Sequence, residues 1–478
     1  MNRTKVTRIL SIILVIGFSV TFFSSCVKKS MDGMIIFTQV AGKGRDIIYV
    51  TGDSWRYIPK ARIVAVEPDN PGGSLKLLTA GFYSARSPEI SYDGKCMLFA
   101  AQQKQSDPWQ IWEMNIKDSK IRQITTSLEN CIDPAYLPGG RLIFSKLAVN
   151  DTLKAGHSLY TCNLDGSSIK RITFNPHTYL GSSVLKDGRV LTISRQLYPD
   201  QREAIFVILR PDGTKAEMFY KGMAGSALLS RGWETMNGKI VFIESDKGSQ
   251  ERGNLVSINY NRPLHTRVNL TSEIKGDFRA VFPLQSGRLL VSYRPTETDR
   301  YALYEFDPEN MVLGQAIYSN ADYDVLEALI VRKHDRPKKL PSEVDMGVKT
   351  GLLLCQDINV LDIQSSGNSS SFPKAGKIEV LGIDSTLGLV QVEKDGSFYL
   401  KVMSDTPFQI QTIDEDGRVL HGPCGWIWLR PNERRGCVGC HEDPELAPDN
   451  RLPLAVKKSP VTIPVHISGV IEKEISLE

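Results

Sequence analysis

Three residues in the last tenth of this sequence have the types and the spacing to bind a haem covalently. In the stretch "RRGCVGCHEDPE", Cys437, Cys440 and His441 form the pattern Cys-x-x-Cys-His. In a c-type site the two thiols add to the vinyl groups of the haem, and the adjacent histidine becomes an axial ligand of the iron. The sequence therefore predicts one covalently attached haem c at these residues.

Two other chemistries use the same side chains. Zinc is bound by thiolates and imidazoles, so Cys437, Cys440 and a further group such as Cys424 or His421 form an alternative set, with His441 as a zinc ligand in place of an iron ligand. Against zinc, Cys440 and His441 are adjacent and point apart unless the backbone turns tightly. A disulfide between Cys437 and Cys440 is the third alternative.

The second axial ligand of the predicted haem stays open at this stage. Met403, His421 and His466 are candidates by residue type and by nearness in the sequence, and an open position is the fourth alternative. An open position favours small-molecule chemistry, whereas a filled one favours electron transfer. The sequence does not decide whether the protein is an enzyme.

The haem pocket must be built largely from elements that precede the motif, because only 37 residues follow His441. We therefore expect the haem to lie against the preceding β structure, not inside an independent cytochrome fold. Trp426 and Trp428, on one face of an expected strand, could cover it or simply pack in a core. Arg434 and Arg435 could contact the haem propionates or a partner, or lie in a solvated turn.

The beginning of the sequence has the features of a bacterial lipoprotein leader. Arg3, Lys5 and Arg8 precede an apolar run over 9–23, and small residues then lead to Cys26. We expect residues 1–25 to be a signal peptide, Cys26 to be lipidated and residues 26–33 to be a tether. The protein would then be anchored to a membrane of the cell envelope and face the periplasm, where c-type haems are attached and disulfides are permitted.

Composition narrows the choice of partners. The net charge of +4, from 58 basic and 54 acidic residues, is too small to indicate a nucleic-acid partner, so we expect a redox or envelope protein as the partner.

Besides Cys26, Cys437 and Cys440, five cysteines remain. This number is odd, so at least one should be a free buried thiol or a metal ligand; the five are Cys96, Cys131, Cys162, Cys355 and Cys424.

A repeat fills the middle of the chain. A turn with glycine precedes a short apolar run five times, with glycine at positions 94, 140, 188, 238 and 287, at intervals of 46, 48, 50 and 49 residues. Further apolar segments follow each run. Four strands per repeat of this length are typical of β-propeller blades.

The predicted fold is therefore all-β, with a propeller over 34–320. The segments "MIIFTQV" and "IVAVE" supply an irregular first blade whose outer partner could come from later in the chain, which gives six blades. The segment "EALIVRKHDRPKKL" could belong to a seventh. We expect a connector over 321–376, a small antiparallel β-sandwich-like domain over 377–420, and an irregular segment with the haem motif over 421–478.

Two resemblances add to this interpretation. The stretches "SPEISYDGKCMLFAA" and "DPAYLPGGRLIFSK" resemble the repeats of TolB-type propellers, which implies the fold but not a ligand. The stretch from "VEKDGSFYLKV" to "GCHEDPELAPDN" is similar to the middle domain of the hydrazine synthase alpha-subunit family. That resemblance implies a c-type haem at Cys437, Cys440 and His441.

The sequence also departs from that family. Hydrazine synthase alpha subunits carry a further haem-binding domain, whereas this chain has a single Cys-x-x-Cys-His. The resemblance also implies a tyrosine shortly after the motif that serves the iron and leaves the motif histidine for zinc, but Glu445 stands four residues after His441. These departures argue against hydrazine formation. Two hypotheses remain: a lipid-anchored mono-haem redox protein, and a non-catalytic propeller that binds an envelope partner and holds zinc or a disulfide.

Overall fold

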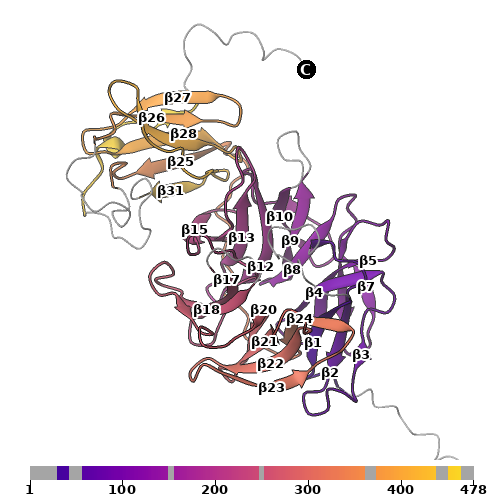
Figure 1. The fold of residues 1–478 in the computed structure, drawn as a ribbon. Coiled ribbons are helices and arrows are strands. Elements are labelled where there is room, and N and C mark those ends of the chain that lie inside the picture. Colours follow the sequence, from indigo (N-terminus) through magenta and orange to yellow (C-terminus); the bar gives the residue numbers. More distant parts are fainter. Residues whose placement is uncertain are drawn as a thin grey trace, which may run out of the picture.

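The computed structural model describes residues 30–41, 56–148, 156–246, 252–360, 373–437 and 450–464. Over these ranges the strands form eight four-stranded sheets, which confirms the all-β prediction. Six of the sheets are arranged around one axis as a propeller, and the other two form a separate sandwich beside it (Figure 1).

The blades are numbered here from the blade that contains the first strand, and each is given from the axis outward. Blade 1 contains β24 (Tyr323–Ile330), β1 (Ile35–Ala41), β2 (Arg62–Val66) and β3 (Lys76–Leu77). Blade 2 contains β4 (Ser84–Ile90), β5 (Cys96–Gln102), β6 (Gln110–Asn115) and β7 (Ile121–Gln123). Blade 3 contains β8 (Cys131–Leu137), β9 (Arg141–Ala148), β10 (Gly156–Asn163) and β11 (Lys170–Arg171).

The second half of the ring repeats this order. Blade 4 contains β12 (His177–Val184), β13 (Val190–Gln196), β14 (Ile205–Leu209) and β15 (Glu217–Tyr220). Blade 5 contains β16 (Trp233–Glu234), β17 (Lys239–Ser245), β18 (Gly253–Asn259) and β19 (Val268–Asn269). Blade 6 contains β20 (Asp277–Pro283), β21 (Leu289–Arg294), β22 (Ala302–Asp307) and β23 (Val312–Tyr318).

The repeated glycines make the turns between the first and second strands of blades 2 to 6. All five have positive φ, from 71° at Gly94 to 90° at Gly188, a region that a residue with a Cβ rarely adopts. Because the strands of a blade alternate in direction, these turns lie on one face of the propeller, together with the turns between third and fourth strands. We call this face the turn face.

Ring closure differs from the sequence prediction. The late strand that completes blade 1 is its innermost strand, β24, and not an outer one; Ile35 pairs with Ile330 and Ala41 with Tyr323. The propeller therefore ends at Ile330 and not at residue 320. The segment assigned to a seventh blade begins inside β24, so the described residues form six blades.

Neighbouring blades are joined by a recurring hydrogen bond. A backbone N–H at or just before the third strand of one blade donates to a side-chain oxygen at the inner strand of the next. Examples are Gly253 N to Asp277 Oδ1 at 2.8 Å and Tyr301 N to Asp324 Oδ1 at 2.9 Å. Because these N–H groups are buried, each bond satisfies a donor that would otherwise be costly to bury.

The second domain is a β-sandwich with wider limits than predicted. One sheet has the order β31 (Arg434–Cys437), β25 (Thr350–Cys355), β28 (Phe398–Met403) and β32 (Val461–Thr462), and the other has β27 (Thr386–Gln391), β26 (Lys377–Leu381), β29 (Gln409–Ile413) and β30 (Val419–His421).

The limits of 377–420 are therefore wrong, because β25 comes from the predicted connector and β31 and β32 from the predicted irregular tail. The first sheet is also mixed: β31 and β32 run parallel to their partners. A short 3₁₀ helix, η2 (Leu454–Lys457), precedes β32. No helix in the described part of the chain is long and apolar enough to cross a membrane.

Candidate functional site

Cys437, the first residue of the predicted haem motif, is the last residue of edge strand β31. It pairs in parallel with Cys355 of β25, and its carbonyl oxygen accepts a hydrogen bond from Gln356 N at 2.9 Å. Side chains alternate along a strand, so Arg435 and Cys437 face one side of the sheet, and Arg434 and Gly436 are the exposed residues of β31. Cys437 is half-buried and packs on the core of the sandwich.

Two further cysteines contact the same core. Cys355 is buried in it, and Cys424 packs against it beside Cys437. Burial, followed by the neighbouring Cys437 thiol, raises the pKa of Cys424 to about 11, although a hydrogen bond from Ile410 N to its sulfur acts in the opposite direction. The sequence indicated Cys424 as a neighbour of the motif. It gave no signal for Cys355, which only strand pairing brings to Cys437.

The other residues named in the haem and lipid predictions lie outside the described part of the chain. They are Cys26, Cys440, His441, Glu445 and His466. Within the described ranges, no group of three or more His, Cys, Asp or Glu side chains is arranged to hold a metal ion.

The donor types still fit a c-type haem: a half-buried thiol lies at a sheet edge, and a second thiol and an imidazole follow three and four residues later. Cys437 and Cys440 would carry the thioether bonds and His441 would serve the iron.

The structure separates the two described candidates for the second axial ligand. Met403 pairs with Thr350, at the opposite end of the β25–β28 pair from Cys355. Thr350 and Cys355 are five residues apart on β25, which is about 16 Å along the strand. Met403 is therefore far from Cys437, and the structure does not support it as the second axial ligand. His421 ends β30 at the edge of the second sheet, and its backbone N–H donates to Thr412 Oγ1 at 3.0 Å. Only two residues separate His421 from Cys424, so it stays a candidate.

Trp426 and Trp428 do not form the expected haem-covering face of a strand. Around them the backbone makes only an isolated bridge, between Ile427 and Phe408. The Trp426 indole N–H donates to Tyr198 O of the propeller at 2.8 Å, and Trp428 packs edge-to-face on Tyr179 of blade 4. Both indoles therefore serve the contact between sandwich and propeller, which agrees with the packing alternative.

The residues just before Cys437 make a polar clamp between the two domains. Arg430 donates to Asp212 O of blade 4 at 3.0 Å and pairs with Asp405 of the sandwich at 2.5 Å. The carboxylate of Glu433, which is 1% exposed, accepts from Lys215 N of the propeller and from Arg430 N, both at 2.8 Å.

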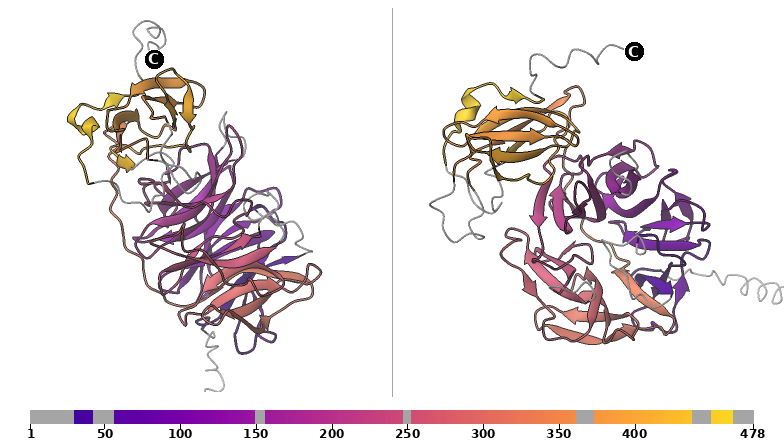
Figure 2. Two further views of the ribbon diagram at one scale, coloured as in Figure 1. Left: turned by 60° about the vertical axis from the view of Figure 1, so that its left-hand side comes forward. Right: turned by 45° about the horizontal axis from the view of Figure 1, so that its top comes forward.

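Arg435 belongs to the same clamp, because its guanidinium pairs with Glu433 at 2.8 Å. Arg434 and Arg435 thus lie on a strand and not in a solvated turn. The clamp, formed by Arg430, Glu433 and Arg435, fixes the entry of the motif segment on blade 4, beside which the sandwich lies in Figure 2.

The chain after the motif segment is also anchored. Arg451 pairs with Asp395 at 2.7 Å, and Leu454 N donates to the same carboxylate at 2.8 Å. Although partial burial acts to raise it, hydrogen bonds from Ser397 and Leu454 and the charge of Arg451 together lower the pKa of Asp395. The described residues before and after the motif segment are therefore both fixed to the sandwich.

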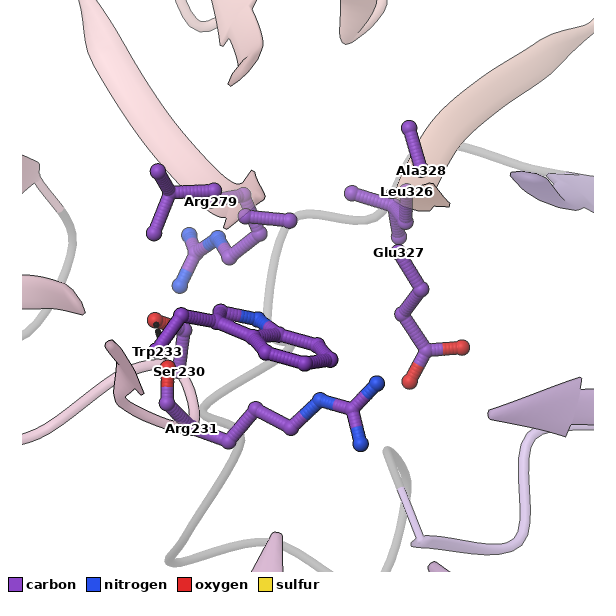
Figure 3. A pocket seen from close by; sticks show the side chains of 9 residues that line it. Ser230, Arg231, Trp233, Arg279, Leu326, Glu327 and Ala328 are labelled. Atoms are coloured by element: carbon purple, nitrogen blue, oxygen red, sulfur yellow. Dashed lines mark hydrogen bonds between the residues drawn. The ribbon is translucent and has the colours of Figure 1, made fainter. Parts of the chain in front are cut away.

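A second candidate site is a cavity near the propeller axis, between blades 5, 6 and 1 (Figure 3). Its walls include Arg231, Trp233, Arg279 and Glu327. The Arg231 guanidinium lies 4.0 Å from the centre of the Trp233 ring and donates to Glu89 of blade 2 at 3.0 Å. Arg279 donates to the hydroxyl oxygen of Tyr301 at 3.0 Å. These charged groups are thus engaged with protein partners, which is typical of a structural polar core.

That polar core continues across the axis. Arg86, on the inner strand of blade 2, is 1% exposed and pairs with Glu327 at 3.1 Å and with Asp133 of blade 3 at 3.2 Å. Ser87 N also donates to Glu327 at 2.8 Å, and Gly181 N of blade 4 donates to Asp133 at 3.0 Å. One arginine and two carboxylates therefore join four blades at the centre of the ring.

The cysteines of the propeller agree with the count made from the sequence. Cys131 and Cys162 are free buried thiols in the core between blades 2 and 3. Burial raises the pKa of both, to about 11 for Cys131 and about 12 for Cys162, so both are neutral at physiological pH. The prediction of at least one free buried thiol is confirmed.

Comparison with known proteins shows what most of the sandwich is similar to. Residues 355–442 match the model of the hydrazine synthase alpha subunit middle domain. The hydrazine synthase subunit alpha of Kuenenia stuttgartiensis is 24% identical over 87% of this chain and 67% of its own length. The resemblance seen in the sequence is thereby confirmed: residues 355–442, which include both the clamp and the motif, match the model of this family.

One solved structure agrees with this chain over most of its length. Kuenenia stuttgartiensis hydrazine synthase superposes with a TM-score of 0.76 at 21% identity, over 89% of this chain and 71% of that chain. A TolB from Acinetobacter baumannii also matches, with a TM-score of 0.44 at 14% identity, over 64% of this chain and 68% of that chain. The first match shows that propeller and sandwich together have the fold of that enzyme's chain.

Proposed function

We propose that this protein is a lipid-anchored propeller protein of the cell envelope that carries one covalent haem c and acts in redox chemistry or electron transfer with a protein partner. The observation that carries the proposal is the position of Cys437. It opens a Cys-x-x-Cys-His motif at the edge of a hydrazine synthase alpha middle domain, directly after a clamp that fixes the segment to blade 4. A haem bound there supplies one-electron redox chemistry.

The described residues have definite roles in this proposal. Glu433 and Arg430 hold β31 against the propeller, so that the segment leaves Cys437 at a fixed position. Arg451 and Asp395 hold its return. The described residues on both sides of the motif segment are thus anchored to folded domains.

Haem attachment is tested on the full chain made in a strain with cytochrome c maturation. We expect a pyridine haemochrome spectrum of c type, and a haem-stained band that survives denaturing electrophoresis. Cys440→Ser should abolish the covalent band, whereas Cys131→Ser, a buried cysteine of the propeller, should keep it. Absence of covalent haem from the native chain in that strain would refute the proposal.

The alternative function is a non-catalytic propeller whose cysteine segment holds zinc or a disulfide. The observation that favours it is the position of Cys424 beside Cys437 on one core, which puts a third sulfur near the motif. Elemental analysis and thiol titration of the same preparation separate the three states. Stoichiometric zinc without haem, or one disulfide without either, would support this alternative.

Lipid anchoring is tested separately from the haem. Cells fed a radiolabelled fatty acid should label the native chain, and Cys26→Ser should remove the label, because the thiol of the predicted first mature residue accepts the lipid. Cys96→Ser serves as the matched cysteine control and should remain labelled. An unlabelled native chain would disprove the anchor and leave the haem proposal untouched.

A further inference from the structure

A basic strap crosses the turn face of the propeller. We give this name to residues 332–343, which leave β24 in blade 1 and run without helix or strand structure toward blade 4. His334 N donates to Tyr92 O of blade 2 at 3.0 Å, and Lys338 N donates to Lys186 O of blade 4 at 3.0 Å. Blades 1 and 4 are opposite each other in a ring of six, so the strap crosses the middle of the face.

Close backbone contacts hold the strap to this face. A Cβ at Gly188, in the inner turn of blade 4, would lie only 2.1 Å from Lys338 O, so glycine is required there by space as well as by its φ of 90°. The strap ends on the last turn of blade 4, where Asp212 accepts hydrogen bonds from Ser342 Oγ at 3.0 Å and Glu343 N at 2.8 Å. The strap is thus a fixed part of the surface.

The strap is strongly basic and exposed. Residues 332–340 contain five arginines and lysines and one acidic residue, Asp335. Their net charge is therefore +4 with histidine neutral. The basic residues, all exposed, are Arg332, Lys333, Arg336, Lys338 and Lys339. Among the described residues, no carboxylate lies within ion-pair distance of any of these five.

The chain enters the propeller beside the beginning of the strap. Gly33 N donates to Val331 O at 2.7 Å, and Val331 N donates to Met34 O at 2.9 Å. Cys26 precedes Gly33 by seven residues, which span at most about 25 Å when fully extended. A lipid on Cys26 would therefore hold the blade 1 end of the strap close to the membrane surface.

We propose that the strap is a docking surface for the phosphate groups of anionic phospholipids, which turns the propeller so that its turn face is directed toward the bilayer. The inference rests on the lipid anchor of the proposed function, because the anchor brings this face to the membrane. Each basic side chain near an anionic bilayer strengthens binding roughly fivefold at moderate ionic strength. Five such residues on one fixed segment are enough for reversible binding without the lipid.

The test uses the chain from residue 27 onward, which lacks the predicted lipid acceptor and retains every described residue. Co-sedimentation is measured with vesicles of phosphatidylcholine, with and without about one third phosphatidylglycerol. We expect binding only to the phosphatidylglycerol vesicles, and its loss at about 0.5 M NaCl, where the Debye length falls to a few ångströms. The triple variant K333E/K338E/K339E should bind at least about tenfold more weakly.

The matched control is K104E/K221E/K275E, which makes the same change in net charge at three exposed lysines on connections of the opposite face. It should bind as the native chain does, and circular dichroism should show both variants folded. Equal losses in both variants, or native binding to phosphatidylcholine alone, would overturn the proposal.

A competition arm separates a lipid surface from a free phosphate ligand. Glycerol phosphate is added at the same total phosphate concentration and ionic strength as the vesicles, and it should leave vesicle binding unchanged. Its displacement of the chain from the vesicles would instead indicate a soluble anion as the ligand and would also overturn the proposal. Because no lipid is attached in this experiment, a failure here is distinct from a failure of the labelling test.

Discussion

Replacement of Arg86 by methionine is expected to lower the free energy of unfolding of the propeller by about 3–5 kcal/mol. The side chain of Arg86 is 1% exposed and is shared between Asp133 and Glu327. Methionine fills similar space but leaves two carboxylates near each other without their cation, in a position that water reaches poorly. The loss of the partner, more than the loss of packing, causes the destabilisation.

This explanation can be separated from simple loss of volume. In the Arg86→Met background, Glu327→Gln should recover part of the lost stability, because only one uncompensated carboxylate then remains. Urea unfolding of the full chain, followed by fluorescence, measures both effects. Arg288→Met, which removes an exposed arginine from a pair with Glu305 on blade 6, is the control and should change the midpoint little. Failure of Glu327→Gln to recover any stability would contradict the electrostatic explanation.

Stability should also fall as the pH decreases from about 7 to about 5. Two histidines of the propeller are buried, His157 on blade 3 and His177 on blade 4. For both, burial lowers the pKa to about 3, and the charge of a nearby arginine acts in the same direction. His157 Nε2 shares a hydrogen bond with the Tyr57 hydroxyl at 2.8 Å, and His177 Nδ1 shares one with Ser194 Oγ at 2.9 Å.

The sign follows from proton linkage. Below the unfolded-state pKa of about 6.5, the unfolded chain binds a proton at each histidine, whereas the folded chain does not until about pH 3. The unfolded state is therefore favoured progressively as the pH falls through this window. Each histidine should contribute a loss of about 2 kcal/mol between pH 7 and pH 5. Half-buried Glu89, whose pKa is raised by desolvation, acts in the opposite direction and is protonated more readily in the folded state.

The double variant H157Q/H177Q provides the test. Between about pH 7 and about pH 5, the native chain should lose roughly 4 kcal/mol more unfolding free energy than the double variant does. His265→Gln, at an exposed position, is the control and should keep the native pH dependence. The same pH dependence in the double variant and in the native chain would show that other groups cause the acid sensitivity.

Local sequence was sufficient to predict most of the propeller. Turn glycines and the apolar runs after them recur at nearly constant intervals, and each blade is built mainly from neighbouring strands. Blade 1 is the exception, because its inner strand β24 lies almost 300 residues after its partner β1 in the sequence. Such a pairing leaves no local signal, which is why the boundary at residue 320 and the suggestion of a seventh blade were wrong.

The candidate site divides in a similar way. The thiol and imidazole types at Cys437, Cys440 and His441 could be identified from spacing alone, as could Cys424 nearby. Spacing could not identify three other features, because each depends on which strands pair and which faces pack. They are the position of Cys355 next to Cys437, the distance that excludes Met403 as an axial ligand, and the interface role of Trp428. Glu433 shows this best: a glutamate beside two arginines resembles a solvated charge cluster, yet it is 1% exposed.

The sequence by itself determined the chemistry that this protein has available and the repeat that builds its main domain, because residue types, turn glycines and strand periodicity are local properties. Tertiary structure alone decided where that chemistry lies. The parallel pairing of β31 with β25 brings Cys437 onto the sandwich core, and the clamp joins that strand to blade 4. Long-range pairing also lays the basic strap across the turn face beside the point of chain entry, since hydrogen bonds between distant segments follow from packing and not from local preference.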